Sequence, residues 1–338
     1  MPHKPSLILV TPALADANNG NWQTARRWAR LLSGHWRVTV TRRWDASLPG
    51  PAPDALLALH ARRSADSVAA WAQHHPDRPL VLALTGTDLY RDIGTDASAQ
   101  ASLRLAHRLI VLQDRGPLGL PEALRDRCHV VLQSCSARRT LPKPVSRLRV
   151  VMVGHLREEK DPATLLAAVR RIRPDEGIFI DHIGAALDPE LGEAAQRTAA
   201  DCPHYRWLGA LPHSPTRERI QRAHLLVHTS RLEGGAHVVM EAVRSGTPVL
   251  ASHMDGNVGM LGEGYAGYFP VGDAYALVDA LRSLRASQQG PAPLTLAALQ
   301  AQCAHRAPLF DPASERAALL RALDFTRSPY PLSAGASP

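Results

Sequence analysis

The sequence predicts an α/β protein with two doubly wound domains, each a parallel sheet between layers of helices. Short apolar runs of strand length alternate with segments of helical spacing along most of the chain. This alternation is typical of a parallel sheet covered on both faces. It stops at a basic, proline-containing stretch over 137–148 and then begins again. A chain of 338 residues is long enough for two such domains, each with its own core.

The individual elements follow from local patterns. Trp22, Ala25 and Trp28 recur at helical spacing. Pro162 suits the first turn of a helix, and Gly246 closes another helix before the next strand. The expected strands are 7–11, 37–41, 55–59, 80–84, 108–112, 129–132, 149–153, 178–183, 205–208, 225–229 and 247–252. The expected helices are 22–32, 64–74, 161–172, 189–200, 214–223, 236–245, 274–286 and 313–325.

These elements indicate how the chain is divided. We expect a first domain over 1–145, a second over 146–312, a helix over 313–326 that can pack back on the first domain, and a flexible tail over 327–338. In doubly wound domains, ligands bind beyond the carboxyl ends of the strands. Functional residues are therefore expected in the segments that follow strands.

The formal net charge of +8 lies entirely in the first half of the chain. Residues 1–145 carry 19 basic and 11 acidic side chains, and residues 146–338 carry 20 of each. Only three basic residues are lysines, namely Lys4, Lys143 and Lys160. A solvated, arginine-rich surface explains much of this composition but not the asymmetry, which suggests an anionic partner for the first domain.

Composition also excludes several classes of protein. No apolar run approaches the roughly 18 residues that a membrane helix needs, and Thr11-Pro12 ends the run at 7–10 too early for an export signal. The four cysteines are scattered without C-x-x-C spacing, which argues against disulfides and zinc. No Asp-x-Asp pair is present to hold a metal. We expect a cytoplasmic protein that needs no metal or other cofactor and binds small molecules, not nucleic acid or, stably, a membrane.

The sharpest motif is the segment 233–241, EGGAHVVME, between an expected strand and an expected helix. Its glycines let a ligand approach the backbone, and amides at the helix start can hold an anion. The glutamates Glu233 and Glu241, with seven residues between them, can accept hydrogen bonds from sugar hydroxyls. A tight turn with a charge near the helix start explains the pattern equally well.

Two further segments lie where strands run into helices. The first, GHLREEKDP at 154–162, contains Lys160 in a chain that otherwise uses arginine, and a lysine supplies a compact point charge for a diphosphate. The second, DGNVGMLG at 255–262, has glycines that suit a backbone amide cradle. Taken singly, a solvated charge cluster and a plain turn are the simpler explanations.

Together, in this order and spacing, the three segments resemble the donor half of a GT-B glycosyltransferase of family 4. The stretch EAVRSGTPV at 241–249 matches the family pattern E-A-x-x-x-G-x-P-V throughout, and the likeness covers about 149–285. It implies two Rossmann-like domains facing a central cleft, the first binding an acceptor and the second a nucleotide sugar. It also implies the donor contacts: Lys160 on the diphosphate, Glu241 on the ribose hydroxyls, and Glu233, Gly234 and Gly235 at the donor sugar.

One position departs from the family pattern. The arginine that grips the diphosphate in the family falls on His155 here, and Arg157 follows two residues later. Either residue can take its place, and both count as donor-binding candidates.

Three peptides resemble a narrower branch of the family, the selenosugar synthases of selenoneine biosynthesis. They are TPALADANNGNWQTA at 11–25, LTGTDLYRD at 84–92 and GHLREEKDP at 154–162. With this branch the likeness runs nearly end to end and includes His155. It implies that selenium passes from selenophosphate to C1 of a UDP-sugar, UDP-GlcNAc or UDP-glucose, and that UDP and phosphate are released.

Two polar loops of the first domain are candidates for the acceptor site. Residues 18–21 lead into a helix, where an oxyanion can bind, and residues 85–88 end an expected central strand. The acceptor-binding candidates are Asn18, Asn19, Asn21, Thr85 and Thr87. Gly20 joins the donor-binding candidates. The candidates for catalysis are Asn21, Thr87, Asp88 and His155.

Two other functions stay open at this point. A family 4 glycosyltransferase with a lipid or sugar acceptor would use the basic first domain against anionic headgroups, with 22–32 as the helix nearest the membrane. A non-catalytic sugar-nucleotide-binding protein would keep Lys160 and Glu241 without acceptor chemistry. Turnover of a UDP-sugar with candidate acceptors separates the three.

Overall fold

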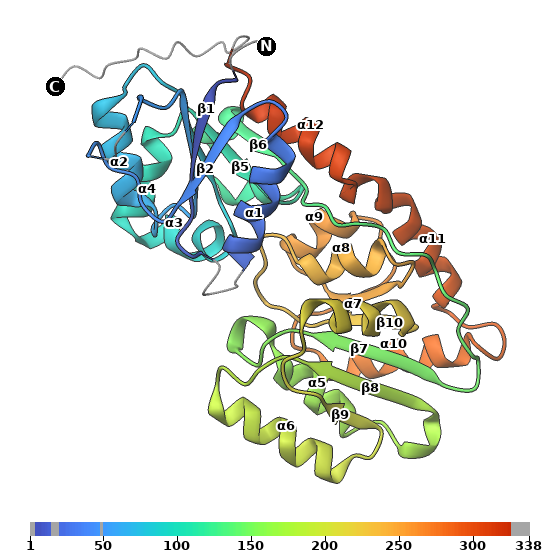
Figure 1. Ribbon diagram of the computed structural model, residues 1–338. Coiled ribbons are helices and arrows are strands. Elements are labelled where there is room, and N and C mark those ends of the chain that lie inside the picture. The colour runs from blue at the N-terminus through green and yellow to red at the C-terminus, as the bar shows by residue number, and fades with distance from the viewer. Residues whose placement is uncertain (1–3, 15–19, 48–49, 326–338) are drawn as a thin grey trace. The chain divides into compact units, whose positions relative to one another are not determined.

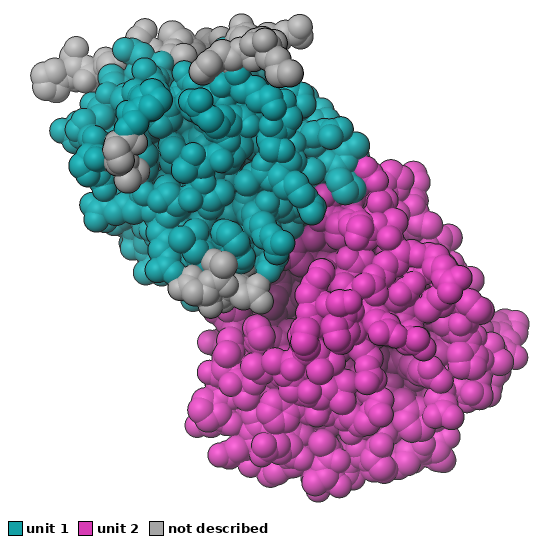
Figure 2. Space-filling view, in the orientation of Figure 1, with its two compact units in different colours: residues 1–133, 312–338 teal, residues 134–311 magenta. Residues whose placement is uncertain are grey.

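The computed structural model describes residues 4–14, 20–47 and 50–325. They divide into two compact units (Figures 1 and 2): unit 1 spans residues 1–133 and 312–338, and unit 2 spans residues 134–311. The tail expected at 327–338 lies outside the described residues. Within the described ranges, no helix combines the length and the apolar character that a membrane crossing demands.

Unit 1 is built on six parallel strands in the order β2-β1-β3-β4-β5-β6. From β1 the chain moves outward to β2 and then returns to the other side of β1 as β3, so the strand order reverses between β1 and β3. The strands are β1 Ser6–Val10, β2 Arg37–Thr41, β3 Ala55–Leu59, β4 Leu80–Ala83, β5 Arg108–Val111 and β6 Cys128–Val130.

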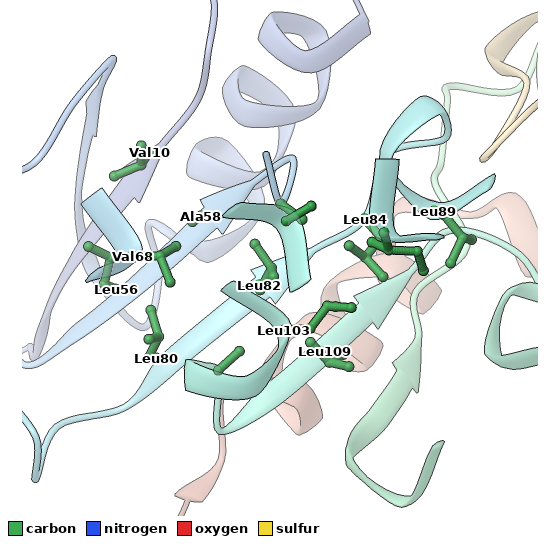
Figure 3. Close-up of a cluster of buried hydrophobic side chains, with 14 of the residues drawn as sticks. Val10, Leu56, Ala58, Val68, Leu80, Leu82, Leu84, Leu89, Leu103 and Leu109 are labelled. Atoms are coloured by element: carbon green, nitrogen blue, oxygen red, sulfur yellow. The ribbon is translucent and has the colours of Figure 1, made fainter. Parts of the chain in front are cut away.

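Alternate residues of these strands enter two separate cores. On one face, Leu57 packs with Trp28 of α1 (Gly20–Leu32) and Leu319 of α12 (Pro312–Ala322). On the other face, Leu56 packs with side chains of α2 (Ala65–His74) and α4 (Ala97–Leu105), as Figure 3 shows in part. The strands β3, β4 and β5 are buried along their whole length, which explains why their sequences are apolar apart from Arg108 at the start of β5. The short helices of this unit are η1 Asp88–Asp92, α3 Ile93–Thr95, η2 Gly116–Gly119 and η3 Glu122–Arg127.

Unit 2 has a second sheet of six parallel strands, in the order β12-β11-β10-β7-β8-β9. This is the dinucleotide-binding strand order, with the reversal between β7 and β10. The strands are β7 Leu148–Val153, β8 Ile178–Ile183, β9 Tyr205–Trp207, β10 Leu225–His228, β11 Val249–Ser252 and β12 Tyr268–Phe269. The helices are η4 Glu158–Lys160, α5 Pro162–Val169, η5 Pro174–Glu176, α6 Pro189–Asp201, α7 His213–Arg222, α8 His237–Val243, α9 Asp255–Leu261, α10 Ala274–Ala286, α11 Leu296–Arg306 and η6 Ala307–Phe310.

The division between the units falls at Gln133 and Ser134, earlier than the expected boundary at 145. The extended segment after Ser134 is hydrogen-bonded to unit 2: Arg138 N donates to the Arg244 carbonyl at 2.9 Å, and the Pro144 carbonyl accepts from His224 Nε2 at 2.9 Å. Gly246, which ends the turn after α8 with φ of +68°, faces this segment, since a Cβ there would lie 2.0 Å from Thr140 Oγ1. The basic stretch is thus bound along unit 2.

Apart from helices of six residues or fewer, three helices of the described chain were not expected from the sequence. In α9, Gly256 and Gly259 favoured a loop, whereas the segment is helical and buried. The helices α4 and α11 have weak periodicity because short alanine-rich segments carry few apolar anchors. Their places are fixed by packing on the sheet and on α8.

The return of α12 to unit 1 depends on a buried carboxylate. Glu315 is 1% exposed. Its Oε1 accepts from Trp28 Nε1 at 2.6 Å, and its Oε2 lies 3.0 Å from Arg27 Nε. Both partners belong to α1, so one side chain ties the last described helix of the chain to the first.

We therefore predict that Glu315→Ala lowers the free energy of unfolding by about 3–5 kcal/mol, because it removes the buried partner of a guanidinium. Urea unfolding followed by circular dichroism measures this. Glu193→Ala serves as control, since Glu193 forms an exposed pair with Arg197, and its loss should cost less than about 1 kcal/mol. Equal losses in the two variants would contradict the role given to Glu315.

Candidate functional site

The candidate donor site of unit 2 lies where its strand order reverses. Gly154 and His155 follow β7, and Thr229 and Ser230 follow β10, the neighbouring strand. Since the carboxyl ends of parallel strands meet at one edge of the sheet, the segments 154–162 and 229–241 are brought together there. The sequence analysis predicted that both segments follow strands. That they lie side by side at this edge follows from the sheet topology.

Lys160 is held in place by the backbone around it. Its carbonyl accepts a hydrogen bond from Thr229 Oγ1 at 2.7 Å. The next residue, Asp161, adopts a left-handed conformation with φ of +45° and caps α5 through Thr164. Arg231 Nε lies 3.0 Å from the Asp161 carboxylate. The turn that carries Lys160 is thus fastened to the end of β10.

The side chain of Lys160 forms a close ion pair with Glu233. The same Glu233 oxygen accepts from Ser230 Oγ at 3.0 Å and lies 3.6 Å from Nε2 of the buried His228. Burial is the largest single influence on Glu233 and acts to raise its pKa, but the charge and hydrogen bond of Lys160, with the contributions of His228 and Ser230, together hold the pKa below its ordinary value. Glu233 is therefore ionised, and Lys160 and Glu233 form one polar unit without added ligand.

One glycine of 255–262, Gly256, serves packing at this point. A Cβ on Gly256 would lie 2.2 Å from the Glu233 carbonyl oxygen, so glycine is required for α9 to approach the Glu233 turn. The expected amide cradle is not a loop, because Asp255–Leu261 is helical. Gly234 is buried, whereas Gly235 is half-buried, immediately before α8.

Glu241 lies on α8, two turns after Glu233, and is almost fully buried. Its Oε1 accepts from His213 Nε2 at 2.7 Å and lies 3.8 Å from Nη1 of Arg217. Both partners come from α7. The sequence analysis missed them because the residues of α7 are mostly polar or charged, a composition that is typical of a solvent-exposed helix.

His155 and Arg157 differ in environment. The His155 Nδ1 accepts from the Ala185 amide at 3.0 Å. Burial, and then the charges of Arg157 and Lys160, lower its pKa. The Arg157 side chain is exposed and lies 3.8 Å from Glu159. His155 is thus oriented by the backbone as a neutral ring, whereas Arg157 is a solvated cation on the same turn.

In unit 1, Asp88 organises the turn after β4. It is fully buried. One carboxylate oxygen accepts from the amides of Thr85 and Gly86 at 2.8 and 3.0 Å, and the other accepts from the Ala61 amide at 3.0 Å. With its oxygens occupied in this way, Asp88 shapes the loop that presents Thr85 and Thr87.

His60 is a residue that the sequence analysis missed. It follows β3 with φ of +75°, a strained conformation for a residue with a Cβ. It is buried, and its Nε2 lies 3.4 Å from Thr87 Oγ1. Burial lowers its pKa, against the opposing charges of Asp88 and Asp92. A lone histidine after an apolar run was the only signal available, and such a histidine is usually structural.

The remaining candidates concern the start of α1. Gly20 and Asn21 are the first two residues of this helix, and the Gly20 carbonyl accepts from Thr24 Oγ1 at 2.9 Å. Asn18 and Asn19 lie outside the described residues. The helix α1 thus begins within the expected polar loop, at Gly20.

The chain is similar in sequence to one protein family and in structure to several solved proteins. Residues 136–298 match the family Glycosyl transferases group 1. HepE of Anabaena, in complex with UDP-glucose, is 16% identical with a TM-score of 0.73, over 95% of this chain and 99% of that one. Sucrose-phosphate synthase from Thermosynechococcus elongatus is 16% identical with a TM-score of 0.72, over 95% and 98%. The pneumococcal O-GlcNAc transferase GtfA, in complex with UDP and GlcNAc, is 16% identical with a TM-score of 0.61, over 79% and 56%.

No curated protein sequence matches the chain. The structural likenesses confirm the predicted GT-B fold with two parallel-sheet α/β domains. The group 1 match over most of unit 2 supports a glycosyltransferase.

The buried histidines give the protein a specific pH dependence. Burial lowers the pKa of His228 to about 4. As pH falls below about 6.5, an unfolded histidine takes up a proton, whereas the folded ring stays neutral until about pH 4. Stability is therefore lost over this window, at a slope of up to about 1.4 kcal/mol per pH unit for each such histidine.

We predict that His228→Gln reduces this slope by roughly that amount, 1.4 kcal/mol per unit, between pH 5 and 6. Urea unfolding at several pH values measures the slope, and His305→Gln, at an exposed position, controls for the chemical change. If the slope of His228→Gln is identical to that of the unaltered protein, His228 titrates alike in the folded and the unfolded state.

Proposed function

We propose that this protein is a glycosyltransferase that joins the sugar of a UDP-sugar to the selenium of selenophosphate, in the cytoplasm. The observation that carries the donor half is the cluster of Lys160, Glu233 and Glu241 at the strand reversal of unit 2. The group 1 match spans this cluster. UDP or UDP-glucose in complexes of HepE, and UDP with GlcNAc in GtfA, support a uridine diphosphate sugar as the donor.

The donor cluster supplies what departure of a nucleoside diphosphate requires. Lys160 is a point charge for the growing negative charge on the diphosphate, and His155 and Arg157 lie in the same segment after β7. Glu241 offers a buried carboxylate to the ribose hydroxyls. Glu233 holds Lys160 in the absence of donor, so donor binding replaces this ion pair with a lysine–phosphate contact and frees the carboxylate for the sugar.

Three observations support selenophosphate as the acceptor. The likeness to selenosugar synthases runs nearly end to end and includes the peptide that contains Thr85 and Thr87. The net positive charge is confined to the first half of the chain, where a small anion would be attracted. In unit 1, Thr87 stands beside His60 at the ends of two neighbouring strands.

The reaction balances with water as co-reactant. Selenium attacks C1 of the sugar, the bond from C1 to the diphosphate oxygen breaks, and UDP leaves. Water then cleaves the selenium–phosphorus bond, giving the selenosugar and phosphate. Because selenophosphate is already an anion, the first step needs no general base. We also propose that the transfer needs no metal, since the chain has no Asp-x-Asp pair and Lys160 is available for the diphosphate.

We predict that Lys160→Ala and Glu241→Ala each weaken UDP binding at least about tenfold, as expected when a charged hydrogen-bond partner is removed. Isothermal titration calorimetry with UDP measures this. Lys4→Ala serves as control, because Lys4 lies in unit 1 and donates to the Ser33 carbonyl. Unchanged affinity in both site variants would remove the donor assignment.

The acceptor is tested by mass spectrometry of products from UDP-GlcNAc or UDP-glucose with selenophosphate. We predict a hexose product with the selenium isotope pattern, formed equally well in EDTA. Thr87→Val should raise the KM for selenophosphate several-fold while UDP binding stays unchanged. Release of UDP only with lipid or sugar acceptors would refute the selenium step, and UDP binding without turnover on any acceptor would favour a non-catalytic role.

A further inference from the structure

A buried arginine of α7 has no role in the function proposed so far. Arg217 is 3% exposed, although arginine is rarely buried without close pairing. Its Nη2 donates to the Ser136 carbonyl at 3.0 Å. Among the described residues, its buried Nε has no hydrogen-bond partner. Burying a guanidinium with an unsatisfied donor is costly, so its position calls for a compensating purpose.

Among the described residues, the carboxylate paired with Arg217 is that of Glu241. The Nη1 of Arg217 lies 3.8 Å from Glu241 Oε1, and both side chains are buried. At this distance the interaction is mainly electrostatic, because the separation exceeds a hydrogen bond. In surroundings of low polarity, such a charge attracts the Glu241 carboxylate strongly. Arg217 thus restrains the orientation of the carboxylate.

His213, one turn earlier on α7, approaches the same oxygen from solvent. Its ring is exposed, and its Nε2 lies 2.7 Å from Glu241 Oε1. The buried Arg217 and the exposed His213 therefore both lie against Oε1. No donor to Oε2 is present in the described part of the chain, which leaves that oxygen for a ligand. The two contacts to Oε1 fix the direction in which Oε2 points.

We propose that Arg217 is a positioning residue, which orients Glu241 so that the site accepts a nucleotide ribose and discriminates against 2′-deoxyribose. The inference rests on the proposed function, in which Glu241 binds the ribose hydroxyls. Its action is through Glu241, since Arg217 is buried behind the carboxylate. A carboxylate held in one orientation accepts from two neighbouring hydroxyls, and loss of one hydroxyl leaves it partly unsatisfied.

The test is the ratio of the dissociation constants for 2′-deoxy-UDP and UDP, measured by calorimetry. The unaltered protein should prefer UDP by about tenfold or more, the effect of one charge-assisted hydrogen bond. In Arg217→Gln, UDP binding should weaken about tenfold and the ratio should fall to near one. Arg217→Lys keeps a cation, and should recover part of the ratio. Glu241→Gln should also lower the ratio.

Controls separate this role from a structural one. Arg222→Gln removes an exposed arginine of the same helix, paired with Glu218, and should leave the ratio unchanged. General loosening of α7 would weaken both nucleotides equally, so an unaltered ratio in both Arg217 variants overturns the proposal. If the unaltered protein binds UDP, but Arg217→Gln has the same ratio of dissociation constants as the unaltered protein, only this inference fails. If the unaltered protein binds neither nucleotide, the proposed function fails with it.

Discussion

The parallel arrangement of both sheets is the constraint on which the functional geometry depends. Every described strand pair in the two units is parallel, so all strands of a sheet end at the same edge. Where the order reverses, the helices that follow two neighbouring strands depart to opposite faces, and their first turns diverge. Lys160 follows β7 and Glu233 follows β10. Because these two strands are neighbours and end at the same edge, the two side chains meet there, although 72 residues lie between them in the chain. The close ion pair is thus a product of topology, with local sequence supplying only the two charges.

Much of the fold could be predicted because the strands are short, apolar and bounded by turns. The strand over 178–183 and the helix over 274–286 have the expected bounds. The failure at α9 has a tertiary cause. In Asp255–Leu261 the glycines resemble a loop, but Gly256 is needed for close approach to the Glu233 carbonyl, which is a tertiary requirement with no local signature.

Part of the candidate site could be predicted from the sequence. Lys160, Glu233 and Glu241 occur at a recognisable spacing, and the structure brings Lys160 and Glu233 into one ion pair, while their role in binding a donor stays a prediction. Arg217 and His60 lack such a pattern. Arg217 has charged neighbours on an ordinary-looking helix, and only its burial marks it. For His60, the informative quantity is a backbone angle, which no composition or periodicity reveals.

The position of α12 has a consequence for the order in which the protein is made. Unit 2 is complete in sequence once Asp311 has been synthesised, and all its strands and helices are then present. One face of the unit 1 sheet still lacks Leu319 and Ala322, which belong to its core. Synthesis proceeds from the N-terminus, at roughly 5–20 residues per second, so this apolar face is exposed until the final helix leaves the ribosome. The half of the protein that begins first therefore finishes folding last, and a nascent chain halted before Pro312 would carry a finished unit 2 joined to a unit 1 with an open core.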